Sequence, residues 1–188
     1  MKLYVNHNID YNHFMLQLNF YPESDKKEYV RAADEYSLIW KKEGEKIVKL
    51  IEKYSGLTFK TKIINAVTFD GISYSTPMRL ASNYKYENKE ATLVHELLHR
   101  LLMDNNFSFS NKETFNKDVH GVIYLVLYDI LVEFLGVNIA NKNKELEISY
   151  GNSDYKDAWK WALSFSKEER SKKFKEIRLN SKLINLKT

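Results

Sequence analysis

The sequence predicts an α+β fold: a mostly helical single domain with a small mixed β-sheet, whose edge strand precedes a helix that carries two histidines. The chain of 188 residues is 44% hydrophobic and 14% aromatic, which is enough for one globular domain with its own core. Short stretches with apolar residues at every second position predict strands, and longer stretches with apolar residues at spacings near 3.6 predict helices. One of these helices contains the motif His95-Glu96-Leu97-Leu98-His99.

The first third of the chain predicts two strands followed by a long helix. Residues 3–5 and 14–20 are short segments with the alternation of strands. Residues 23–54 have a helical spacing of apolar side chains, and Gly44 is expected to kink or divide this helix. Gly56 is expected to end it, because glycine readily adopts the left-handed conformation that follows many helix C-termini.

Two extended segments precede the histidine motif. Residues 57–69 are rich in β-branched and aromatic side chains, which favours a strand, and Asp70 and Gly71 supply a turn. Residues 72–83 form the second extended segment. Pro77 within it cannot donate a hydrogen bond to a neighbouring strand, so we expect this segment at the edge of the sheet.

The histidine motif lies on a helix that we expect to begin near Asn88 and to end at Asp104. Asn88 is a suitable N-cap, and Glu90 brings negative charge to the first turn, where the helix dipole favours it. The polar residues after Asp104 predict a long loop as far as Lys117.

The C-terminal part of the chain is also predicted to be helical. Residues 118–135 form an apolar helix that ends at Gly136, and residues 155–165 and 167–179 suggest two further helices. The basic side chains of the last segment are interpreted as a solvated surface.

Within the single domain, spanning residues 1–188, we expect a core at about residues 57–135 and a C-terminal helical extension at about residues 152–188. Residues 119–135 are slightly short for a membrane span and carry Asp129 and Glu133, so they are interpreted as a buried helix. The N-terminus lacks the apolar stretch of a signal peptide, and we therefore expect a cytoplasmic protein without a membrane span.

Composition limits the possible classes of function. The chain has no cysteine, which excludes disulfides, thiolate zinc sites and cysteine nucleophiles, and leaves His, Asp and Glu as the candidate metal ligands. The net charge of +4 gives no strong indication of a nucleic-acid partner.

The spacing of the two motif histidines is suited to holding a metal ion. A helix advances about 100° per residue, so His95 and His99 lie about 40° apart on one face, one turn above the other. Glu96 is near enough to contact a metal-bound water without being a ligand itself. Zinc lowers the pKa of its bound water to about 7, and a neighbouring carboxylate can take the proton as the water attacks a carbonyl.

An apolar stripe on the same helix predicts that the histidines, at its border, face the interior of a cleft. The stripe consists of Val94, Leu97, Leu98, Leu101 and Leu102.

His120 is the preferred third ligand, because a catalytic zinc usually takes three from the protein. It shares one face of its helix with Tyr124 and several apolar residues, and we expect that face to pack on the motif helix. Glu133 is the second choice. Asp129 and Glu133 point to the other side of the helix, where we expect them to be exposed or paired with a lysine. Asp104 and Asp118 are the other candidate ligands that follow the motif in the chain.

The HELLH stretch resembles the HExxH helix of zincin-type metallopeptidases, and the order of helix, strands, edge strand and motif helix resembles their α+β core. The resemblance covers about residues 57–135. It implies zinc bound by His95 and His99, Glu96 as general base, and a peptide or protein substrate whose backbone pairs with part of residues 72–83.

The sequence departs from several zincin families. Leu102 and Asn105 stand where metzincins have a glycine and their third histidine, and peptide deformylases need a cysteine ligand. The gluzincin layout, with its third ligand on a later helix, fits better, although His120 would replace the usual glutamate.

Zincins also need a donor for the oxyanion of the tetrahedral intermediate. Tyr124 is the preferred candidate, because it lies one turn after His120 on the same face. The alternatives are Tyr84, Tyr86 and Tyr128.

Three classes of function are compatible with the sequence. The first is a zinc-dependent metallopeptidase that hydrolyses peptide bonds with a metal-activated water. The second is a zincin-like protein that binds zinc but acts as an interaction or regulatory module, and the third is a metal-free helical binding protein. We favour the first, because a structural zinc site has no need for Glu96.

Overall fold

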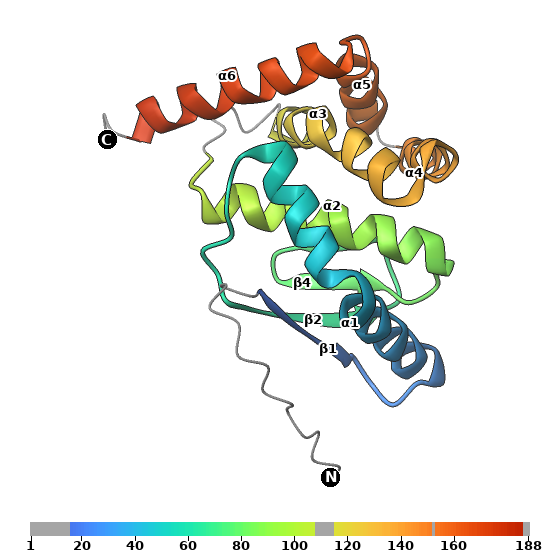
Figure 1. Ribbon diagram of the computed structural model, residues 1–188. Helices are drawn as coiled ribbons and strands as arrows, with labels where there is room; N and C mark the ends of the chain where they lie inside the picture. Colours follow the sequence, from blue (N-terminus) through green and yellow to red (C-terminus); the bar gives the residue numbers. More distant parts are fainter. Residues whose placement is uncertain (1–15, 108–114, 152, 186–188) are drawn as a thin grey trace.

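The computed structural model of the chain describes residues 16–107, 115–151 and 153–185. In these ranges the protein is mostly helical, with a small mixed sheet of four strands, which confirms the predicted α+β class. The sheet lies at one end of the molecule beneath α1 and α2, and the helices α3 to α6 pack beyond them (Figure 1). The helix α2 therefore lies between the sheet and the C-terminal helices.

The sheet consists of β1 (Gln17–Pro22), β2 (Ile63–Phe69), β3 (Tyr74–Ser75) and β4 (Met78–Ala81), in the order β1-β2-β4-β3. The pairs β1–β2 and β2–β4 are parallel, whereas β3 and β4 form an antiparallel hairpin. In β2 the side chains of Ile64, Ala66 and Thr68 are buried. The alternation follows from the period of two along a strand, with one face toward the helices.

The strands match the predictions in type but not in every boundary. Of the two N-terminal strands, residues 3–5 lie outside the described residues, and residues 14–20 correspond in the described part to β1. Residues 57–62 precede β2 instead of belonging to it. The Asp104 carboxylate at the end of α2 accepts hydrogen bonds from the backbone N–H groups of Lys60 and Thr61, at 3.1 and 2.9 Å, so this segment is fixed to a helix end.

The expectation of one edge strand at residues 72–83 is corrected by the structure. The segment folds into the β3–β4 hairpin, and the Thr76–Pro77 bond, which is cis, lies in the turn between the two strands. Pro77 therefore occupies a turn, where its missing N–H costs no ladder hydrogen bond. In the described sheet, β3 forms the edge on this side and β1 forms the other.

The helix α1 (Lys27–Ser55) continues without a break through Gly44, so it is not divided there. Glycine is needed there for packing, because a Cβ atom would lie 2.8 Å from Cδ2 of Trp40. Gly56 ends the helix as predicted, with φ of 62° and its N–H donating to the Glu52 carbonyl at 2.8 Å.

The motif helix α2 (Tyr86–Asp104) begins earlier than expected, with Lys85 and not Asn88 in the N-cap position. The apolar helix α3 (Phe115–Leu135) contacts α1 and α2 as well as all three helices that follow it. It is buried in the core, as predicted. Among the described helices, none combines the length and apolar character that crossing a membrane requires.

The chain ends with α4 (Val137–Ser149), α5 (Ser153–Ala162) and α6 (Lys167–Asn185). The last two correspond to the predicted C-terminal helices, but α4 was not expected. Its sequence is polar, and its buried residues are Ala140, Asn143 and Glu147. Their spacing of three and four residues is helical, but polar residues contribute little to an apolar periodicity.

Candidate metal centre

Two imidazoles meet on the surface of α2. His95 and His99 are one helical turn apart, their rings stack with centroids 4.9 Å apart, and their Nε2 atoms are separated by 3.0 Å. Two nitrogen ligands of one tetrahedral zinc lie roughly 3.3 Å apart, since each Zn–N bond is about 2.0–2.1 Å long. The spacing of the two Nε2 atoms is therefore close to that of a shared metal ion.

His120 joins them from α3. Its ring centroid lies 4.9 Å from that of His99 and 5.5 Å from that of His95. One nitrogen atom from each of the three histidines lies within 4.8 Å of the others. His95 and His120 are buried and His99 is half-buried. The structure thus brings together the three residues that the sequence proposed as metal ligands, and their donor set fits a zinc ion.

A buried carboxylate orients the first of these histidines. The Oε1 atom of Glu147 on α4 lies 2.7 Å from Nδ1 of His95 and accepts a hydrogen bond of 3.0 Å from the Asn143 amide. Its Oε2 atom accepts one of 2.9 Å from the Trp159 indole. Because a carboxylate accepts, His95 donates from Nδ1, and in the neutral ring Nε2 keeps its lone pair toward His99.

This arrangement is the one that metal-binding histidines usually have, with the second ring nitrogen donating to a carboxylate. Burial raises the pKa of Glu147, but attraction to His95 and the hydrogen bonds from His95 and Trp159 outweigh it, so the net pKa lies below the usual range. Glu147 is therefore an ionised acceptor. Sequence reasoning missed it, because it lies 52 residues beyond His95 on a helix that was not predicted.

The pKa values of His99 and His95 are also shifted. Burial, together with the charges of His95 and His120, holds the pKa of His99 well below its usual range, which favours the neutral imidazole that binds metals. For His95, burial lowers the pKa, but Glu147 outweighs it and the net pKa is raised.

Glu96 is buried beside the histidines, with 5% of its surface exposed, and it lines the same cavity. Burial raises the pKa of its carboxyl group to about 7. A carboxyl group with a pKa near neutrality can both take up and release a proton, as a general base that later acts as an acid must do.

Tyr124 packs against His95 and His120 but does not line the cavity. Its ring stacks on Trp159 with centroids 3.8 Å apart and has centroids 5.9 and 5.7 Å from those of His95 and His120. Burial and the charge of Glu147 raise the pKa of its hydroxyl. The described residues that line the cavity do not include Tyr124, but they do include Tyr84, Tyr150 and Tyr155. The rings of Tyr155 and His120 pack edge to face with centroids 4.6 Å apart, so Tyr155 is a cavity-lining tyrosine in direct contact with the histidine cluster.

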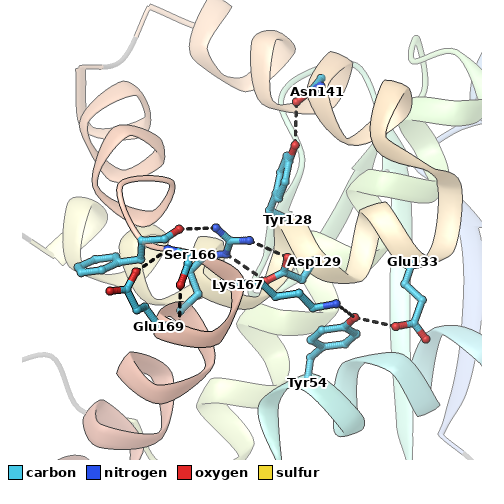
Figure 2. A network of polar contacts seen from close by, with 10 residues as sticks. Tyr54, Tyr128, Asp129, Glu133, Asn141, Ser166, Lys167 and Glu169 are labelled. Carbon is cyan, nitrogen blue, oxygen red and sulfur yellow. Dashed lines mark hydrogen bonds and ion pairs between the residues drawn. The ribbon is translucent and has the colours of Figure 1, made fainter.

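Glu133, the second choice for the third ligand, lies in a different part of the molecule. Its carboxylate pairs with Lys53 at 2.7 Å and accepts a hydrogen bond of 2.6 Å from the Tyr54 hydroxyl, which also binds Lys167 (Figure 2). The expected pairing with a lysine is confirmed.

Asp129 on the same helix α3 was expected to be exposed or paired with a lysine, and this is wrong. It is buried, and its two carboxylate oxygens accept hydrogen bonds of 3.0 and 2.7 Å from Arg170 on α6. Asp129 and Glu133 thus bind side chains of neighbouring helices, and in the described part of the chain His120 is the α3 residue of the candidate metal cluster.

A cavity of about 530 Å³ opens over the histidines. Residues of the β3 strand and its flanks also line it, among them Ser73, Tyr74, Ser75 and Thr76. In the described sheet the outer edge of β3 has no neighbouring strand. An unpaired strand edge beside a metal centre can hold an extended peptide through backbone hydrogen bonds.

Comparisons with known proteins identify no relative: no family model matches the chain, and searches of curated proteins and of solved structures found no match. A proposal about function therefore has to be argued from the described residues, and in particular from the histidine cluster and its buried glutamates.

Proposed function

We propose that this protein is a zinc-dependent metallopeptidase of the zincin type. The observation that carries the proposal is the convergence of His95, His99 and His120, from two helices, beside the buried Glu96 in one cavity. The outer edge of β3, which has no neighbouring strand among the described residues and lines that cavity, supports it further.

The three histidines would hold the metal through imidazole nitrogens, with one position left for a water molecule. Zinc bound there supplies Lewis-acid chemistry, because it lowers the pKa of a water to about 7 and polarises a substrate carbonyl. Glu147 keeps His95 in the orientation and tautomer that binding requires.

The protein's own groups then move the protons. Glu96 takes a proton from the water as its oxygen attacks the carbonyl carbon, and gives that proton to the leaving amine when the C–N bond breaks. We assign the hydrogen bond to the carbonyl oxygen, as this oxygen gains negative charge, to Tyr155, which lines the cavity and packs against the His120 ring. The substrate backbone lies along β3.

The metal content of the full chain tests the ligand set. We expect about one zinc per chain in the native protein, by elemental mass spectrometry, because three histidines and a water complete a tetrahedral site. His120→Ala should lose most of the metal, whereas Glu133→Ala should keep it, because Glu133 pairs with Lys53 away from the cluster. Retention of zinc by His120→Ala would contradict the assignment.

The role of Glu96 is tested by Glu96→Gln, which is nearly isosteric but cannot take up a proton. We expect the variant to keep its zinc and to lose peptide hydrolysis by about 100-fold or more, because a positioned general base contributes about that much. Cleavage of a peptide library, followed by mass spectrometry, measures it. Zinc binding without hydrolysis by the native protein would instead favour the interaction module.

A further inference from the structure

The cavity beside the histidine cluster has an apolar wall. Leu102 and Met103 follow His99 by about one turn on α2, Phe107 comes shortly after the helix, and Val119 precedes His120 on α3. Leu102 and Val119 are buried, whereas Met103 is 50% exposed. Apolar side chains therefore border the histidines on the side where α2 ends.

The apolar wall continues to the strand edge. The Thr76 hydroxyl donates to the Met103 sulfur at 3.0 Å, which joins the β3–β4 turn to the end of α2. Ile72 and Tyr74, which also line the cavity, are 54% and 41% exposed. Exposed apolar side chains gathered at the mouth of a cavity are typical of a surface that binds another molecule.

Charged side chains are few in this cavity. Among the described residues that line it there is no lysine or arginine, and its carboxylates are Glu96 and Glu147. Both Glu147 oxygens already accept hydrogen bonds, from Asn143, Trp159 and His95. An acidic side chain of a bound peptide would be buried without a described cation to pair with. A basic side chain would have Glu96 as its partner, and this pairing would occupy the carboxylate beside the candidate metal ligands.

We propose that the cavity selects an extended polypeptide with a bulky apolar side chain, such as Leu, Met or Phe, next to the bond that is cleaved. The side chain rests against Leu102, Met103, Phe107 and Val119, while the backbone pairs with β3. The identity of the cleaved bond rests on the proposed function, but the selection itself can be measured as binding, without cleavage.

The first experiment measures that binding with the zinc-loaded Glu96→Gln variant of the full chain. Random peptides blocked at both ends are captured by the variant and identified by mass spectrometry. The dissociation constants of single peptides that differ only at the selected position are then measured by fluorescence polarisation. We expect Leu or Phe to bind about tenfold or more tightly than Ala, Asp or Lys at that position, because even one methylene in an apolar pocket changes selectivity about tenfold.

The second experiment places charge on the wall. In the same Glu96→Gln background, Met103→Glu should weaken binding of the apolar peptides about tenfold and strengthen binding of those with Lys at the selected position. Met103→Lys should likewise weaken binding of the apolar peptides, but should strengthen binding of those with Asp. Met103 is half exposed, so either charge can be solvated in the folded protein. Leu38→Glu is the matched control, because Leu38 is 57% exposed on α1 and does not line the cavity.

The outcomes separate the two proposals. The inference is supported if the protein selects apolar peptides, and if this selection changes in the Met103 variants but not in Leu38→Glu. This holds even if the native protein cleaves none of these peptides, a result that would contradict the proposed peptidase activity. Cleavage or capture of peptides with charged side chains at the selected position would overturn the inference and leave the peptidase intact. If the zinc-loaded protein neither captures nor cleaves any peptide, both proposals are overturned.

Discussion

At the scale of single residues, the hydrogen bond between Glu147 and His95 determines the orientation and the tautomer of the His95 ring. Its carboxylate accepts from His95, Asn143 and Trp159, which belong to α2, α4 and α5. The His95 ring is thereby held at its Nδ1 atom, and its Nε2 atom faces Nε2 of His99. Loss of such a carboxylate typically weakens metal binding although the ligands themselves remain.

Glu147→Gln should lower zinc affinity about 10- to 100-fold, because the amide can no longer accept from His95 with a full negative charge. Competition with a chromophoric chelator measures the affinity. Glu133→Gln is the matched control, since its carboxylate is on the surface and pairs with Lys53. Equal affinities of Glu147→Gln and the native protein would show that Glu147 does not orient His95.

At the scale of elements, the C-terminal helix α6 is fixed to α3 by a buried ion pair. Asp129 and Arg170 are each 8% exposed, and Arg170 also donates to the Phe165 carbonyl at 2.7 Å. Lys167 and Tyr54 extend this polar network toward Glu133 and α1 (Figure 2). The network holds α6 against two helices that lie earlier in the chain.

Asp129→Ala should reduce the free energy of unfolding by about 3–5 kcal/mol, because it leaves the Arg170 guanidinium buried without its partner. Glu133→Ala, one turn further on the same helix, breaks an exposed pair and should cost about 1 kcal/mol or less. Urea denaturation followed by circular dichroism measures both. Similar losses in the two variants would show that burial of the Asp129 pair has no special energetic effect.

At the scale of the whole molecule, the candidate metal centre joins parts of the chain that are far apart in sequence. The ligands come from α2, which lies on the sheet, and from α3, which is packed among the C-terminal helices (Figure 1). A metal ion that binds only the folded state stabilises it in proportion to the logarithm of its concentration over the dissociation constant. Zinc should therefore stabilise the fold as a whole.

Removal of zinc with a chelator should lower the melting temperature of the native protein by roughly 5–10 °C. Zinc at 100 times its dissociation constant contributes about 2.7 kcal/mol, and each kcal/mol shifts the melting temperature of a chain of this size by about 2–4 °C. Differential scanning fluorimetry measures the shift, and His95→Ala should show none. A shift of equal size in His95→Ala would place the stabilising metal elsewhere.

Most elements of the fold could be predicted from periodicity in the sequence. The apolar spacing in α1, α2 and α3 and the glycine at position 56 gave their type and approximate ends, because those signals repeat every few residues along the chain. The helix α4 was missed because its buried positions include Asn143 and Glu147, which pack through hydrogen bonds. The hairpin was missed because an extended segment with a proline is compatible with either an edge strand or a turn.

The sequence by itself determined the local part of the candidate site. The spacing of His95, Glu96 and His99 is fixed by the geometry of one helix, and the stripe from Val94 to Leu102 marked positions that are buried, although α2 is buried on every face between residues 91 and 98. Only the tertiary structure decided that His120 and not Glu133 meets the pair, that Glu147 orients His95, and that β3 and Tyr155 border the cavity. These contacts join residues on different elements, and their positions depend on how the helices pack, which no short-range periodicity contains.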